Sequence, residues 1–224
     1  MRGYYDLSCR PATFDIVAFL TNCKTLGADS VVFDVSKGFQ RKKFSQAVAQ
    51  RMFELVTIPI TEYWGIPWSF GDAGDVAPSH MAHSVTTTNP VLKHFDRADG
   101  SPTITIRESI RNKHRDSNRP EWDKFAKAIG AVVIEDAYVK PISIEDRMAL
   151  YRNSSMNYFC SNGPAALCCY SNLPCLMVSN QAASGTWGEF KEGGQFHWFN
   201  EKQRLFWGED TYENLMSVHA SICP

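Results

Sequence analysis

The sequence predicts an α/β protein of two unequal lobes, the second built on a doubly wound parallel sheet. The chain has 224 residues, of which 44% are hydrophobic and 12% aromatic, so it can bury a sizeable core. Short apolar runs alternate with segments of helical period, which is typical of α/β proteins. Residues 71–100 interrupt this alternation with Gly, Pro and Asn turn signals. They predict a connection between a small N-terminal lobe, 1–95, and a larger C-terminal lobe, 96–224.

The N-terminal lobe shows apolar runs that alternate with two segments of helical period. Residues 13–26 carry apolar side chains at close to helical spacing, and Gly27 follows as a natural C-terminal stop. The run SVVFDV at 30–35 is typical of a buried strand. The expected elements are strands at 4–8, 30–35 and 66–70, helices at 13–26 and 44–56, and one extended piece at 83–87 within the connection.

In the C-terminal lobe the alternation is clearer. Gly130 closes one expected helix, and Ser143 with Asp146 three positions on begins another, as an acidic variant of the capping box. Four strands separated by helices imply a parallel sheet with right-handed crossovers. Residues 180–208 predict an aromatic loop that packs over the sheet end, or alternatively a surface on which sugars stack. The expected strands are 103–106, 131–134, 156–160 and 175–179, and the expected helices are 119–129, 143–151, 164–170 and 211–222.

Charge and hydropathy narrow the class of protein. The formal net charge of −1 gives no global attraction to nucleic acid or anionic lipid, so any anion binding must be local. The N-terminus has no continuous apolar run, and no window approaches the length of a membrane span. We therefore expect a cytoplasmic protein. The seven cysteines contain no C-x-x-C pair, which favours reduced, buried thiols over a zinc site or a disulfide framework.

A basic segment follows the strand expected at 103–106. Residues 107–119 carry five basic and two acidic side chains, a net charge of +3. Arginine forks match phosphate or carboxylate oxygens, and ligands of open parallel sheets bind at the carboxyl ends of the strands. The alternative is a solvated loop whose charges pair with Glu108, Asp116 and Glu121. The candidate anion-binding residues here are Arg107, Arg111, Lys113 and Arg115.

The motif SNGPAAL at 161–167 follows another expected strand. Ser161 and Asn162 offer hydrogen-bonding side chains, Gly163 permits close approach of a ligand to the backbone, and Pro164 suits the first helical position. Unpaired N–H groups at the start of a helix favour bound phosphate. The alternative is an ordinary helix cap and tight turn.

These motifs together resemble the nucleotide-sugar-binding lobe of GT-B-type glycosyltransferases, closest to the heptosyltransferase-like and fucosyltransferase-like groups. The resemblance covers 101–180 and rests on the order strand, IRESIRNKHRDSN, helix, VVIED, helix, strand, SNGPAAL and strand. It implies two Rossmann-like lobes, with an acceptor side in 1–95 and a donor site in 96–224.

The resemblance also implies roles for single residues. The basic residues of 107–115, with Ser161, Asn162 and Gly163, would hold the donor diphosphate, and Tyr138 and Lys140 would lie near the base or ribose. One carboxylate or histidine would deprotonate the acceptor hydroxyl; the candidates are Glu135, Asp136 and His80. No D-x-D occurs, in agreement with transfer that needs no metal ion, and no cofactor is implied. The implied partners are a nucleotide sugar and a glycan or small-molecule acceptor, without nucleic acid.

Other functions stay open from the residues alone. The same fold could bind a phosphorylated or acidic ligand without catalysis, or could serve a nucleotide-sugar epimerase or hydrolase that uses Glu135 and Asp136. Asp72, Asp75, His80 and His83 could supply a general base or loose metal ligands, although surface histidines are the commoner outcome. Walker-type, G-x-G-x-x-G and G-x-S-x-G signatures are missing, which argues against P-loop NTPases, typical NAD enzymes and ordinary α/β-hydrolases.

Overall fold

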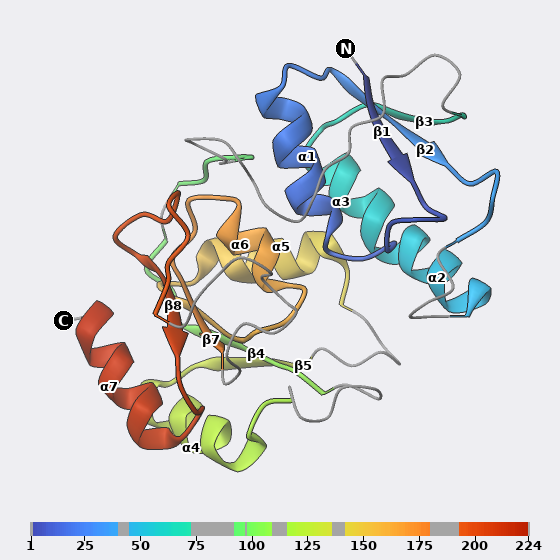
Figure 1. Cartoon of the computed structure of the whole chain (residues 1–224). Helices are drawn as coiled ribbons and strands as arrows, with labels where there is room; N and C mark the ends of the chain where they lie inside the picture. Colours follow the sequence, from blue (N-terminus) through green and yellow to red (C-terminus); the bar gives the residue numbers. More distant parts are fainter. Residues whose placement is uncertain are drawn as a thin grey trace. The chain divides into compact units, whose positions relative to one another are not determined.

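A computed structural model describes residues 2–39, 45–72, 92–96, 98–108, 116–135, 142–179 and 193–223 (Figure 1). The chain divides into two compact units. Unit 1 comprises Met1–Lys93 with Ser143–Glu145, and unit 2 comprises His94–Ile142 with Asp146–Pro224. The extended piece expected at 83–87 lies outside the described residues.

Unit 1 is built on a parallel sheet in the order β1-β2-β3. One face of this sheet carries Tyr5 and Phe33, whose rings meet Phe19 and Phe53 edge to face at centroid distances of 4.8 and 5.1 Å. Gly3 lies where a β-carbon would collide with the Cys23 sulfur, so helix α1 can pack closely on β1 only because this residue is a glycine. The strands are β1 (Arg2–Asp6), β2 (Ser30–Asp34) and β3 (Trp68–Phe70).

The second helical segment of unit 1 is longer than the sequence predicts. The expected helix at 44–56 continues to Tyr63 through a π-helical turn at Phe53–Thr57. Pro59 follows within the first turn of the next α-helix, where a missing N–H is least costly, so the chain stays helical past it. The helical elements of this unit are α1 (Ile16–Thr25), α2 (Gln46–Met52), η1 (Phe53–Thr57) and α3 (Ile58–Tyr63).

Unit 2 contains a fully parallel sheet in the order β5-β4-β6-β7-β8. Counted along the chain, this is the order 2-1-3-4-5 of one common doubly wound fold. The prediction of an α/β protein with a parallel sheet is confirmed. The strands are β4 (Thr103–Ile106), β5 (Val132–Glu135), β6 (Asn157–Cys160), β7 (Cys175–Ser179) and β8 (Gln203–Trp207).

The prediction of only four strands in this lobe is wrong, because β8 lies within the segment 180–208 that was expected to be a loop. Gln203 and Leu205 point inward and Arg204 outward, so the strand has an alternating pattern of only five residues. Pairing with β7 in parallel register makes it a strand. So short a pattern within an aromatic segment carries little local signal.

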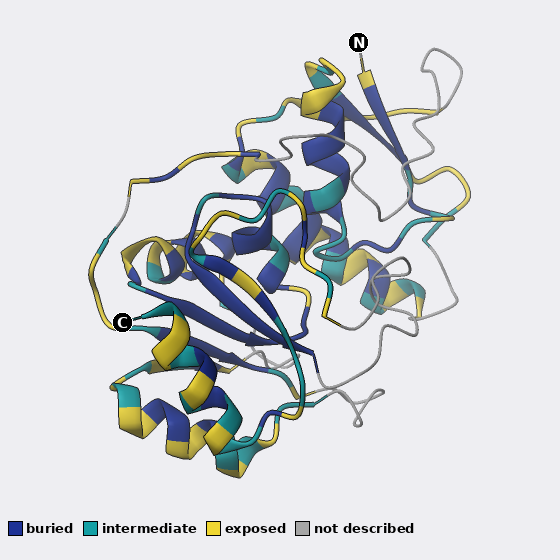
Figure 2. Ribbon diagram, turned by 60° about the vertical axis from the view of Figure 1, so that its left-hand side comes forward, coloured by how far each residue is buried: buried dark blue, intermediate teal, exposed yellow. Residues whose placement is uncertain are grey.

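Helices cover both faces of the unit 2 sheet (Figure 1). Helices α4 and α7 lie on one face, and α5 and α6 lie on the other. Trp122 and Phe125 of α4 pack with Ile104 and Tyr158 of the strands and Leu215 of α7 in one buried cluster. The inner strands β4, β6 and β7 are buried along their length, whereas the edge strands β5 and β8 carry exposed positions, and the helices near the C-terminus alternate buried and exposed positions (Figure 2). The helices are α4 (Arg119–Ile129), α5 (Ile144–Asn153), α6 (Ala165–Cys169) and α7 (Tyr212–Ile222).

Candidate functional site

The switch point of the unit 2 sheet lies between β4 and β6. The chain leaves β4 toward β5 on one side and reaches β6 on the other, and open parallel sheets bind their ligands at such a point. Arg107 follows β4 directly, and Ser161 follows β6 directly. The Arg107 Nη1 donates a hydrogen bond to the Ser161 carbonyl oxygen over 3.2 Å. The two turns that the sequence singled out therefore meet.

Arg107 is held from several sides. Its backbone N–H donates to the Ser117 hydroxyl at 2.9 Å, and its carbonyl accepts from the Ser117 N–H at 3.0 Å. The Arg107 Nε lies 3.8 Å from the Asp116 carboxylate, and the side chain is 16% exposed. These contacts close the base of the basic segment. The Ser117 bonds hold the Arg107 backbone at the strand end, and the contacts with Asp116 and the Ser161 carbonyl orient its guanidinium.

The turn after β6 uses its side chains differently from the expectation. The Asn162 Oδ1 accepts from the Ala165 N–H at 3.2 Å, and its Nδ2 donates to the Thr105 carbonyl at 3.4 Å, so this amide caps α6 and ties β6 to β4. Helix α6 has only five residues, so the dipole at its start is small. In the described part of the chain, nothing accepts from the backbone N–H of Asn162 or Gly163. These two N–H groups are therefore the donors that this turn leaves for other partners.

Arg119 belongs to a separate ion-pair network. Its guanidinium donates to Asp123 at 2.8 Å, to Glu135 at 3.1 Å and to Glu108 at 3.4 Å. The hydrogen bond to Asp123 raises the pKa of Arg119 above its ordinary value, against the opposing effect of partial burial. Glu135, a candidate general base, lies exposed at the end of β5 and is engaged by this arginine.

Several candidate residues lie outside the described residues. They belong to three segments: the basic stretch after β4, the stretch after β5, and the connection within unit 1. These candidates are Arg111, Lys113 and Arg115, then Asp136, Tyr138 and Lys140, and finally His80 with its neighbours Asp75 and His83.

A buried cation near the switch point escaped the sequence analysis. Arg147 of α5 is 1% exposed, and its Nη1 donates to the Tyr151 hydroxyl at 3.0 Å. That hydroxyl lies 2.8 Å from the Thr105 Oγ1 on β4. An arginine in a helix of ordinary spacing gives no local sign of burial. The one available clue was that α5 starts after the carboxyl end of β5.

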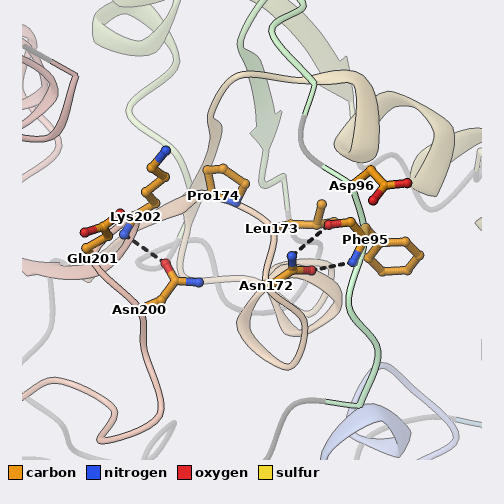
Figure 3. A pocket seen from close by; sticks show the side chains of 8 residues that line it. All are labelled: Phe95, Asp96, Asn172, Leu173, Pro174, Asn200, Glu201 and Lys202. Atoms are coloured by element: carbon orange, nitrogen blue, oxygen red, sulfur yellow. Dashed lines mark hydrogen bonds between the residues drawn. The ribbon is translucent and has the colours of Figure 1, made fainter.

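A depression lies at the opposite edge of the sheet (Figure 3). It has a volume of about 480 Å³ and is found where the chain enters β7 and β8. Its polar groups are largely committed to the protein. The Asn172 amide exchanges two hydrogen bonds with the backbone of Phe95, and the Asn200 Oδ1 accepts from the Lys202 N–H at 2.8 Å. The amino ends of parallel strands seldom hold the ligand, so this depression is the weaker candidate.

The described part of the aromatic segment before β8 packs on unit 2. Trp198 stacks on Tyr170 at a centroid distance of 5.4 Å and donates its indole N–H to the Cys169 carbonyl at 2.9 Å. The Trp207 indole donates to the Gly194 carbonyl at 2.7 Å. Phe196, Phe199 and Phe206 line an open hollow of about 570 Å³ along β8. Trp187 and Phe190 lie outside the described residues.

The cysteines are all free thiols, and five of them are buried. Burial raises the pKa of Cys23 to about 12 and that of Cys168 well above its usual value. These thiols therefore act as small apolar side chains, as the sequence predicts. Within the described ranges, no group of three or more His, Cys, Asp or Glu side chains is arranged to hold a metal ion.

Comparisons with protein-family models, with curated proteins and with solved structures gave no match. A search of the described residues found no helix of the length and apolarity that crossing a membrane requires. The geometry at the ends of β4 and β6 is therefore the feature that bears on function.

Proposed function

We propose that the protein binds the diphosphate of a nucleotide sugar at the carboxyl ends of β4 and β6 and transfers the sugar to an acceptor hydroxyl. In this proposal unit 2 is the donor-binding lobe of a GT-B-like pair and unit 1 is the acceptor lobe. The observation that carries the proposal is the 3.2 Å hydrogen bond from Arg107 to the Ser161 carbonyl. It brings a guanidinium and a turn with N–H donors to one point of the sheet.

Sugar transfer requires little covalent chemistry from the protein at such a site. The bond between the sugar carbon and the phosphate oxygen breaks, the acceptor oxygen bonds to the same carbon, and the nucleoside diphosphate leaves with additional negative charge. Arg107 and the N–H groups of Asn162 and Gly163 stabilise that charge. The acceptor proton passes to a carboxylate or histidine, for which Glu135, Asp136 and His80 are the candidates.

A thermal-shift titration with UDP, GDP and ADP tests the donor site. A nucleoside diphosphate at about 100 times its Kd should stabilise the native chain by about 2.7 kcal/mol and raise Tm by about 5–10 °C. Arg107→Ala and Arg111→Ala should each reduce that rise. Arg204→Ala is the matched control, because Arg204 is an exposed arginine on β8 that contacts Ser221. The proposal fails if none of the three nucleotides changes Tm.

One observation favours a second candidate function, in which the site binds a phosphorylated ligand without catalysis. Glu135 is held by Arg119 and is not aimed at the switch point as an unengaged base. Release of nucleoside diphosphate from UDP-, GDP- and ADP-sugars, measured with and without glycan acceptors, separates the two functions. Saturable binding without release would support the binding module and contradict transfer.

A further inference from the structure

We propose that Arg147 is a second, buried cation of the anion site, which adds fixed positive charge beneath the ends of β4 and β6 and anchors the strand end that carries Arg107. This inference rests on the proposed function, because it concerns the diphosphate that the site would hold. It assigns a charge-supplying and positioning role to a helix residue.

Arg147 is connected to the proposed site by a chain of contacts. Its hydrogen bond to Tyr151 and the contact of that hydroxyl with Thr105 connect α5 to β4 through two short contacts, 3.0 and 2.8 Å long. Thr105 lies two residues before Arg107, and alternate residues of a strand point to the same face. The Thr105 carbonyl also accepts from Asn162. One chain of contacts therefore links Arg147 to both turns of the proposed site.

Arg147 also carries a positive charge in the protein interior. An arginine side chain keeps its proton in proteins, so Arg147 is a permanent cation even at 1% exposure. Burial raises the pKa of the Cys168 thiol on α6, the helix that follows the 161–163 turn, and the positive charge of Arg147 opposes that rise.

A buried arginine acts on a bound anion more strongly than an exposed one does. Water screens an exposed arginine, whereas a buried one acts through a medium of lower effective dielectric and needs no reorganisation when the anion arrives. Burial also raises the pKa of Tyr151, so its hydroxyl stays neutral. The Tyr151 hydroxyl therefore accepts from Arg147 and shares a second hydrogen bond with the Thr105 hydroxyl. The contacts thus hold the end of β4 in one geometry.

Calorimetric titration with inorganic pyrophosphate and orthophosphate tests the proposal on the full chain. A field effect grows with ligand charge, so Arg147→Met should weaken pyrophosphate about tenfold and orthophosphate only about threefold. Arg147→Lys keeps the charge and should stay within about threefold of the native chain for both. Arg152→Met is the matched control, because Arg152 is an exposed arginine of the same helix that stacks on Phe95 at 4.9 Å. This variant should change neither affinity by more than about twofold.

Circular dichroism and Tm without ligand show whether each variant is folded. If Arg147→Met does not fold, Tyr151→Phe decides, because it cuts the link to Thr105 while it keeps the ring and the charge. Pyrophosphate affinity should then fall several-fold. The proposal is overturned by native-like affinity in Arg147→Met, by equal loss in the Lys and Met variants, or by native-like affinity in Tyr151→Phe when Arg147→Met is unfolded.

The same titrations separate this inference from the function on which it rests. If Arg107→Ala weakens pyrophosphate while Arg147→Met does not, the inference alone fails. If the native chain binds neither pyrophosphate nor any nucleoside diphosphate, the proposed function fails with it.

Discussion

Gln203→Met should destabilise unit 2 by about 3 kcal/mol. Gln203 is 5% exposed at the start of β8, and its Nε2 donates to the carbonyls of Cys168, Ser171 and Leu173 at 2.8, 2.8 and 3.2 Å. Its Oε1 accepts from the Asn200 N–H at 3.2 Å. Two amide hydrogens cannot satisfy three carbonyls fully. We therefore count two complete donor bonds and one acceptor bond, at about 1 kcal/mol each. Methionine nearly fills the same volume, so no large cavity adds to the loss.

Urea unfolding followed by tryptophan fluorescence and circular dichroism measures the change. At a slope of about 2 kcal/mol/M, the midpoint should fall by about 1.5 M. Gln195→Met is the control. The exposed Gln195 also bonds the backbone of Leu205, with the Leu205 N–H at 2.7 Å, but water can replace those bonds, so the loss should be at most about 1 kcal/mol. Equal losses in the two variants, or a loss below about 1 kcal/mol in Gln203→Met, would refute the reasoning.

Three further perturbations address other parts of unit 2. Gly130→Ala should lower Tm by about 2–4 °C, because Gly130 ends α4 at a φ of 66°, a conformation that costs other residues about 1 kcal/mol. No atom lies within 4 Å of the added carbon, so a steric clash does not contribute. An unchanged Tm would contradict this prediction. Trp122→Phe should cost about 2–4 kcal/mol in urea unfolding, because it removes the 2.7 Å bond from the indole to buried Asp210; a cost below about 1 kcal/mol would show that this bond matters little. Burial lowers the pKa of His219, so the native state disfavours its protonation, and stability should fall as the pH drops through about 6.5 toward the lower native pKa. His219→Gln should flatten that part of the Tm profile, and a profile identical to that of the native chain would exclude His219 as the cause.

Much of the fold was predictable because it is encoded locally. The bounds of β4, β7 and α4 agree with the sequence prediction residue for residue. In each case a β-branched or apolar run, or a periodic segment closed by Gly130, carries the information within a few neighbours. The last helix begins at Tyr212, one residue after its expected start, because Thr211 is extended and its hydroxyl accepts from the Asn214 N–H as an N-cap.

The missed features depend on contacts and turns that leave no periodic pattern in the sequence. β8 is a strand because β7 offers it a ladder, and α3 continues the preceding helix because a π-turn admits Pro59. Arg147 is a core residue only because Tyr151 and Thr105 lie beside it. No periodicity or composition signals such contacts.

For the candidate site, the sequence alone determined which residues follow each strand, and hence that Arg107 and Ser161 would end up at one edge of a parallel sheet. The order of the strands was decided only by the tertiary structure, which made β4 and β6 neighbours and brought the two turns into hydrogen-bonding contact. Tertiary packing also used the Asn162 side chain in the helix cap, engaged Glu135 with Arg119, and buried Arg147 against the Tyr151 hydroxyl. The physical reason is that the chain order determines which side chains and N–H groups each turn carries. Strand pairing, and the burial that accompanies it, determines which of those groups come into contact.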